Sequence, residues 1–260
     1  MKLTFLGTGT SFGIPIIGCN CVVCQSTDAR DKRTRVGAVV ESDAGTRVLF
    51  DTPPELRLQL VHSGIGRVDA VFFTHDHADH IHGIDDIRAI TVRQRAPIPM
   101  YAEPSVLKRL SQRFPYIFDN TMLPLPGTSK PEGDARTIVD GQHVTVGDLD
   151  VEAISVPHGA MSVLAFRVGS LGYLTDAKSV PESARARLRG IKVLVLNALF
   201  YRPHPTHLSI PEAIDVAASI GAERTYLIHL THETSHADLE RDLPSGVFPA
   251  YDGLEVEIGA

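Results

Sequence analysis

Three histidines and two aspartates fall within six residues, in the run His75-Asp76-His77-Ala78-Asp79-His80. The run directly follows a short apolar segment, residues 69–73, which we predict to be a β-strand. So many imidazole and carboxylate groups cannot be buried without a partner, because their desolvation would cost several kcal/mol. A His-x-His-x-Asp-His run where a strand leads into a helix therefore predicts ligands for two adjacent metal ions, and with them an enzyme.

Three more candidate ligands each follow an apolar run, at the point where a β-strand would end. His158 follows residues 154–157, Asp176 follows residues 173–175, and His229 follows residues 226–228. Strand ends gather at one edge of a sheet, so these side chains can point at a common centre. One such residue alone would be interpreted as a loop residue. All three, added to the histidine-rich run, indicate a single shared site.

This pattern resembles that of the metallo-β-lactamase superfamily, and the resemblance covers essentially the whole chain. It includes the Gly7-Thr8-Gly9 turn after the first predicted strand and the Leu49-Phe50-Asp51-Thr52 segment before the first helix. The implied fold is an α/β fold, a four-layer αβ/βα sandwich with the metals at one edge of two sheets. The implied ligands are His75, His77 and His158 for the first metal, Asp79, His80 and His229 for the second, and Asp176 as the bridge between them.

Two bound cations would make hydroxide available at neutral pH, because a metal lowers the pKa of its bound water from 15.7 towards about 7. The ligand types suit Zn²⁺ or Mn²⁺, and also Fe²⁺. We expect Asp51 either to accept a hydrogen bond from a ligand histidine, which would fix its tautomer, or to cap the following turn.

A second cluster, Cys19-Asn20-Cys21-Val22-Val23-Cys24, lies in a glycine-rich loop. Cys-x-Cys-x-x-Cys places three thiolates within reach of one structural Zn²⁺, and His232 is the natural fourth ligand. The alternative is three free, buried thiols that pack as small apolar groups. The loop together with His229-x-x-His232 resembles the PhnP-like group of cyclic phosphodiesterases, which implies that His232 completes the zinc site while His229 serves the catalytic centre. Relatives in pyrroloquinoline quinone synthesis share the loop but lack the complete catalytic ligand set.

Two residues are candidates for catalysis, His207 and Asp79. His207 precedes a predicted helix over residues 210–220 and matches the histidine proposed as general acid in the phosphodiesterase relatives; the alternative is a loop histidine at a helix cap. Arg88 is a candidate for binding substrate phosphate, or else a surface arginine. Asn197, at the end of the predicted strand 191–197, departs from the pattern of these relatives, which often carry an acidic residue at this position.

We predict a single domain over residues 1–260. It has two halves, and in each half a series of strands is followed by alternating strands and helices. Helices are expected at residues 54–62, 84–94, 104–113, 182–189 and 210–220, and the strands include 2–6, 36–41, 46–50, 149–156, 162–168, 191–197 and 224–228. Residues 114–135 are expected to form a long ordered loop, which could be a lid, a homodimer contact or a plain surface excursion.

The net charge and the number of cysteines limit the kinds of partner and compartment that we expect. The net charge of −6 argues against an extended nucleic-acid partner, since binding to phosphate backbones normally needs a basic face. No signal peptide or membrane span is visible, and three cysteines are too few for a disulfide framework, so we expect a cytoplasmic protein without membrane association.

Taken together, the motifs predict a dinuclear-metal phosphodiesterase that hydrolyses a small cyclic or nucleotide-like phosphodiester through a metal-bound hydroxide. The alternatives are a tRNA 3′-processing type of endonuclease, a thioester or β-lactam hydrolase, and a non-hydrolytic di-iron or binding protein. The endonuclease would need a basic RNA-gripping arm, which the chain does not show. Di-iron relatives tend to carry a glutamate where this chain has His77.

Overall fold

Two β-sheets form the centre of the computed structural model, which describes residues 1–259. Over these residues the first sheet has seven strands in the order β14-β1-β2-β3-β4-β5-β6. Their bounds are β1 Lys2–Gly7, β2 Gly37–Glu41, β3 Arg47–Phe50, β4 Ala70–Phe72, β5 Ile98–Ala102, β6 Gly133–Thr137 and β14 Glu255–Glu257.

The second sheet, over the same described residues, has seven strands in the order β13-β12-β11-β10-β9-β8-β7. Their bounds are β7 His143–Val146, β8 Leu149–His158, β9 Met161–Val168, β10 Leu171–Leu174, β11 Val193–Asn197, β12 Arg224–Ile228 and β13 Val247–Pro249. Strands β10, β11 and β12 run parallel, as do β3 and β4 in the first sheet, so their carboxyl ends meet at a common edge.

Both faces of the central strands are apolar, which is why each sheet is covered twice. In β11, Val193 and Val195 face the core between the sheets, while Leu194 and Leu196 face the helices outside. The core between the sheets is rich in aromatic rings, and the Phe50 ring of one sheet stacks on Tyr173 of the other at 4.8 Å. This two-sided pattern is typical of sheets buried between helices.

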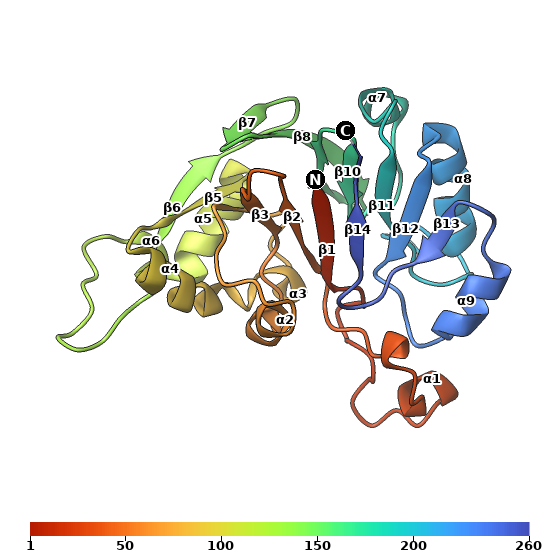
Figure 1. Ribbon diagram of the computed structural model, residues 1–260, viewed down its shortest axis with the longest axis horizontal. Helices are drawn as coiled ribbons and strands as arrows, with labels where there is room; N and C mark the ends of the chain where they lie inside the picture. Colours follow the sequence, from red (N-terminus) through yellow and green to blue (C-terminus); the bar gives the residue numbers. More distant parts are fainter. Residues whose placement is uncertain (260) are drawn as a thin grey trace.

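Helices cover the outer faces of both sheets and complete the predicted four-layer αβ/βα sandwich (Figure 1). The α-helices are α1 Val22–Gln25, α2 Leu56–His62, α3 Ala78–Ile81, α4 Arg88–Gln94, α5 Pro104–Arg113, α6 Pro115–Phe118, α7 Glu182–Arg187, α8 Ile210–Ile220 and α9 His236–Asp242, with 3₁₀ turns η1 Ala29–Asp31 and η2 Ile84–Ile87. None of the helices in residues 1–259 is both long and apolar enough to cross a membrane.

Helix α8 shows how local sequence positions a functional loop. Ser209 and Glu212 form a reciprocal capping box at its start, and Gly221 ends the helix with a positive φ of 76°. A capping box satisfies two backbone N–H groups that would otherwise lack partners, so the start of the helix is well defined. The loop between β11 and α8, which carries His207, is therefore fixed at its far end.

Several short elements differ from the sequence-based expectation. The predicted loop over 114–135 contains helix α6 and the first residues of β6, so the irregular part is residues 119–132, which extend away from the body (Figure 1). The predicted helix 84–94 begins as the 3₁₀ turn η2. Strands β7 and β13 and helices α1, α3 and α9 were not predicted, because runs of three to seven residues carry too little periodicity. The roles suggested for residues 114–135 stay predictions.

Candidate metal centre and active site

The edge where the parallel strands end carries an unusual backbone. Asp51 after β3, Asp176 after β10 and His229 after β12 all have a positive φ, of 60°, 58° and 59°. Non-glycine residues rarely adopt this conformation, and it costs of order 1–3 kcal/mol per residue. The sequence predicts Asp176 and His229 as metal ligands and Asp51 as a possible support of a ligand histidine, so strained backbone occurs at three candidate site residues.

A buried hydrogen-bond network fixes the orientation of two histidines. Asp51 accepts hydrogen bonds from the Thr74 backbone N–H and hydroxyl, each at 2.8 Å, and lies 2.8 Å from His80 Nδ1. Since the Thr74 hydroxyl donates to Asp51, it accepts from Nδ1 of His75, 2.9 Å away. Both imidazoles therefore carry a proton on Nδ1, which leaves Nε2 as the atom that can bind a metal. Of the two roles expected for Asp51, the structure shows the hydrogen bond with a candidate ligand histidine.

His158 is oriented in the same way by a different partner. Its Nδ1 lies 2.8 Å from the carbonyl oxygen of Thr206, which can only accept a hydrogen bond, so Nδ1 carries the proton. The remaining nitrogen, Nε2, is free to act as a ligand. A metal-ligating histidine typically donates its other N–H to a carboxylate or carbonyl in this manner.

The free nitrogens have no hydrogen-bond partner among the described residues. Nε2 of His75, Nε2 of His80 and both ring nitrogens of His229 are buried and unpaired. Leaving a buried polar group unsatisfied costs about 1–3 kcal/mol, so several at one point call for a partner that the side chains do not supply. Cations within the cluster would satisfy the three Nε2 atoms.

The carboxylates of Asp176 and Asp79 lie among these nitrogens. An Asp176 oxygen is 3.6 Å from His75 Nε2 and 3.5 Å from His80 Nε2, while its other oxygen is 3.5 Å from His229 Nε2. Asp79 is 3.4 Å from His80 Nε2 and 3.9 Å from His229 Nε2. These spacings are long for hydrogen bonds but suit ligands that share an ion at about 2.0–2.2 Å from each.

The ligand atoms fall into two groups, in each of which all atoms lie within 4.8 Å of one another. The groups match the two ligand sets implied by the resemblance, with Asp176 close to both. They are His75, His77, His158 and Asp176 in the first, and Asp79, His80 and His229 in the second.

The electrostatics of the cluster also favour a cation. Burial lowers the pKa of His80, but the Asp176, Asp51 and Asp79 carboxylates outweigh it and raise that pKa well above the usual value. Burial raises the pKa of Asp176, but His229 and His80 outweigh it and hold that pKa well below its usual range. The carboxylates stay ionised and stabilise positive charge between them, which is the field that a divalent metal needs.

Asn197, at the end of β11, supports the turn that carries Asp176. Its side-chain oxygen accepts from the Ala177 N–H at 2.8 Å, and its side-chain nitrogen donates to the Ala177 carbonyl at 3.0 Å. A carboxylate at this position could only accept, so the amide serves both backbone groups where an acidic residue would serve one. The departure noted in the sequence thus has a positioning role.

His207 lies beside the metal ligands at the end of its loop. Its Nε2 is 3.3 Å from Asp176, its ring stacks on His229 at 4.7 Å, and its Nδ1 is 2.9 Å from the Thr206 hydroxyl and 3.3 Å from Nδ1 of His204. Burial lowers its pKa, with the Asp176 carboxylate acting in the opposite direction. This position suits a proton donor, but it also brings His207 within ligand distance of Asp176 and His229.

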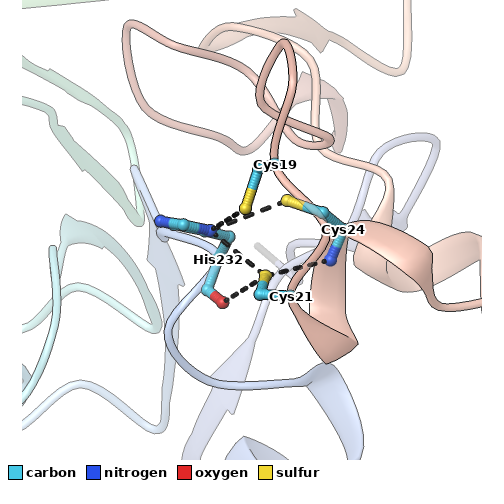
Figure 2. A group of neighbouring side chains, drawn as sticks. All are labelled: Cys19, Cys21, Cys24 and His232. Carbon is cyan, nitrogen blue, oxygen red and sulfur yellow. Dashed lines mark hydrogen bonds between the residues drawn. The ribbon is translucent and has the colours of Figure 1, made fainter.

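The three cysteines converge on His232, as Figure 2 shows. Nδ1 of His232 is 3.3 Å from the sulfurs of Cys19 and Cys21 and 3.6 Å from that of Cys24. All three cysteines are free thiols. Ligands bound to one zinc at about 2.0–2.3 Å stand at such separations, so the four side chains fit a closed, tetrahedral structural zinc site.

The thiols are tuned differently before any metal binds. A hydrogen bond from the Cys24 backbone N–H lowers the pKa of Cys21 to about 6, whereas burial raises the pKa of Cys24 to about 11. Cys21 therefore loses its proton more readily than Cys24. Metal binding at Cys24 must displace a proton, so occupancy of this site should weaken in acid.

The Cys21→Ser variant is expected to lose one zinc equivalent per chain and about 3 kcal/mol or more of unfolding free energy. Cys21 is the N-cap residue of α1 and accepts from the Cys24 N–H; serine keeps that acceptor while removing the thiolate. Elemental analysis and denaturant unfolding provide the measurements. Val22→Ser, which introduces the same residue at an 86% exposed neighbour, should change neither. Full zinc content in the Cys21 variant would exclude Cys21 as a ligand.

Other residues that shape the site were not predicted from the sequence. Thr74 and Thr206 orient histidines, as described above. Two arginines of α5 contact Asp76, which lies between the first two histidines of the run. Arg109 Nε lies 2.7 Å from the Asp76 carboxylate, and Arg113 donates to the Asp76 backbone carbonyl at 2.6 Å. In the sequence, the position of Asp76 between two candidate ligands is the signal that could have indicated a cationic partner elsewhere in the chain. The structure shows that Asp76 is indeed buried.

Arg88, the candidate for binding substrate phosphate, already pairs with a carboxylate on the protein surface. Its guanidinium pairs with Asp85 at 2.7 Å on the exposed start of α4. The arginine that lines a cavity next to the candidate active site is instead Arg202. That cavity, of about 280 Å³, opens beside His207 and His229 and extends to His232.

Comparisons with known proteins agree with this geometry. The family model of the beta-lactamase superfamily domain matches residues 46–230. A solved structure described as a new diphosphatase from the PhnP family is 36% identical, covers 99% of this chain and 98% of its own, and superposes with a TM-score of 0.90.

Two curated relatives are longer proteins. An octanoyltransferase of Porphyromonas gingivalis is 38% identical over 263 residues, which is 99% of this chain but 52% of the relative. A ribonuclease Z of Myxococcus xanthus is 33% identical over 176 residues, which is 66% of this chain and 47% of the relative. The chain thus spans about half the length of these curated relatives. With a matched family model and a full-length PhnP-family relative, the chain belongs to the metallo-β-lactamase superfamily and, within it, to the PhnP family.

Proposed function

We propose that the chain is a metal-dependent phosphodiesterase that hydrolyses a small cyclic or nucleotide-like phosphodiester. The observation that carries this proposal is the arrangement of two ligand groups around Asp176, with His207 3.3 Å from the same carboxylate and beside a small cavity. The names of two relatives, a diphosphatase and a ribonuclease Z, both denote cleavage of phosphate linkages and support the same chemistry.

The first metal would be held by His75, His77 and His158, the second by Asp79, His80 and His229, with Asp176 shared between them. When bound, two divalent cations, Zn²⁺ or Mn²⁺, would supply a water of lowered pKa and neutralise charge on the phosphoryl oxygens. A further Zn²⁺ would occupy the cysteine site. The chain itself keeps three of these imidazoles, those of His75, His80 and His158, in their ligating tautomer through Thr74, Asp51 and the Thr206 carbonyl.

His207 would give a proton to the departing alkoxide oxygen. It lies where the metal ligands meet the cavity, and Thr206 and His204 hold its outer nitrogen so that Nε2 faces the cluster. A positioned general acid of this kind contributes about 10²–10⁴-fold to a rate. Asp79, which sits against His80 and His229, would act through the second metal rather than by proton transfer.

A second candidate is hydrolysis of a diphosphate linkage, which the 36% identical diphosphatase favours. An RNA substrate is less favoured, because the chain has a net charge of −6 and the cavity of about 280 Å³ is small. The octanoyltransferase relative adds thioesters to the substrates that should be assayed.

The test uses the purified chain reconstituted separately with Zn²⁺ and Mn²⁺, and the metal-free protein as control. We expect saturable hydrolysis of bis-p-nitrophenyl phosphate and of 2′,3′-cyclic nucleotides that a chelator abolishes. A metal-loaded protein that leaves both untouched while cleaving a diphosphate or a thioester would overturn the proposal in favour of that linkage.

A further inference from the structure

The cavity beside the candidate active site is built by three segments that meet only in the folded chain. Residues 10–16 follow β1, residues 199–207 follow β11, and residues 229–233 follow β12. His207 and His229 lie at the catalytic side, and His232 of the cysteine site contributes to the wall. The volume, about 280 Å³, is near the lower limit for small-molecule sites, so it accommodates one compact group rather than a polymer.

Phe12 is the first notable feature of this cavity. It lines the cavity, yet 71% of its surface is exposed, so its ring adds little to the hydrophobic core. It sits in a tight turn closed by a hydrogen bond from the Gly13 N–H to the Thr10 carbonyl at 2.9 Å. The neighbouring Ile14 pairs with Arg33 through two backbone hydrogen bonds of 2.7 and 3.0 Å. The chain thus displays an aromatic ring on an anchored segment.

A guanidinium–aromatic pair from the loop after β11, called here the Arg202–Phe200 platform, contributes to the same cavity, with Phe200 buried beneath the exposed Arg202. The Arg202 guanidinium lies 3.8 Å from the centre of the Phe200 ring, and its Nη1 is 2.5 Å from the carboxylate of Glu233. All three residues line the cavity. Because Glu233 already neutralises the guanidinium, the platform offers a planar stacking surface more than a free positive charge.

We propose that this cavity binds a planar heteroaromatic group of the substrate, of the nucleobase class, with Phe12 and the Arg202–Phe200 platform as its stacking surfaces. The inference deepens and rests on the proposed phosphodiesterase function, because it places that group beside His207, where the phosphodiester would be cleaved. Stacking suits this task, since every base has a π-face and contact with aromatic or guanidinium planes is tolerant of base identity.

The test compares two probes that share a ribose phosphate and differ in the base, adenosine 5′-monophosphate and ribose 5-phosphate. Binding is measured by titration calorimetry, which needs no turnover. We expect the wild-type protein to bind the nucleotide about tenfold more tightly than the sugar phosphate. Phe12→Ala should reduce this ratio to about twofold or less by weakening nucleotide binding alone, and Phe12→Tyr should restore it.

The control is Leu125→Ala, which removes an equally exposed apolar side chain (75%) from the loop between α6 and β6. It should keep the wild-type ratio, and thermal unfolding of each variant verifies folding. A wild-type ratio near one, or an unchanged ratio in Phe12→Ala, overturns the subsite even if phosphodiesters are hydrolysed. Conversely, a Phe12→Ala protein that no longer prefers the nucleotide over the sugar phosphate supports the subsite even if no phosphodiester is hydrolysed. In that case only the proposed hydrolysis is wrong.

Discussion

Replacing Asp176 with asparagine is expected to lower kcat/KM for phosphodiester hydrolysis by roughly a thousandfold and to remove at least one catalytic metal ion per chain. Asparagine preserves the size of the side chain but removes the negative charge. Asp176 is the carboxylate whose oxygens approach nitrogens of both ligand groups, at 3.5–3.6 Å. Without its charge, the imidazoles of His80 and His229 lose the anion that stabilises a cation between them. Elemental analysis and steady-state kinetics measure the two effects.

The matched control is Asp134→Asn, which removes an exposed carboxylate on β6 that pairs with Arg136 at 2.7 Å. This variant should keep the wild-type metal content and an activity within about twofold, because exposed ion pairs contribute little. Retention of both metals and of activity within tenfold in the Asp176 variant would show that Asp176 does not bridge the centre.

Replacing His207 with glutamine should lower kcat by about 10²–10⁴-fold for a 2′,3′-cyclic nucleotide and far less for bis-p-nitrophenyl phosphate. An alkoxide needs a proton to depart, whereas nitrophenolate is a stable anion that leaves without one. The contrast between the two substrates therefore reports proton donation by His207. Metal content measured on the same samples should stay at the wild-type level.

This design separates the two roles that the geometry allows for His207. If the metal content falls and both substrates slow by the same factor, His207 is a ligand and the donor must be sought elsewhere. His143→Gln provides the control, because His143 lies on the exposed edge strand β7 and pairs with Asp150 at 2.8 Å. That variant should be indistinguishable from wild type with both substrates.

The sequence could predict the fold, and which polar side chains gather at the sheet edge, because both depend on local signals. Long, periodic segments such as β8 and α8 were placed within one or two residues. Asp176 and His229 could be proposed as ligands because each directly follows an apolar run. Helix α3, by contrast, is four residues long and lies inside the histidine-rich run, where the spacing of ligands overrides any amphipathic pattern.

The supporting residues could not be predicted, since their partners are distant along the chain. The Thr206 carbonyl orients His158 from 48 positions away, and Arg109 reaches Asp76 from 33 positions away. A backbone carbonyl carries no residue-specific signal at all. Likewise, Arg88, the sequence-based candidate for binding phosphate, pairs with Asp85, whereas Arg202 lines the cavity.

The cysteine cluster has a consequence for how the protein is made. Cys19 and His232 are 213 positions apart, so the three thiols leave the ribosome long before the histidine that completes their site. Until then, a nascent chain carries an open cluster of soft ligands that any thiophilic ion can enter. The wall that joins this site to the cavity forms only after residues 229–233 have been synthesised. Closure of the cluster must therefore wait for His232, and under the proposed zinc assignment the ion that enters the thiols first would decide whether the tetrahedral site can form.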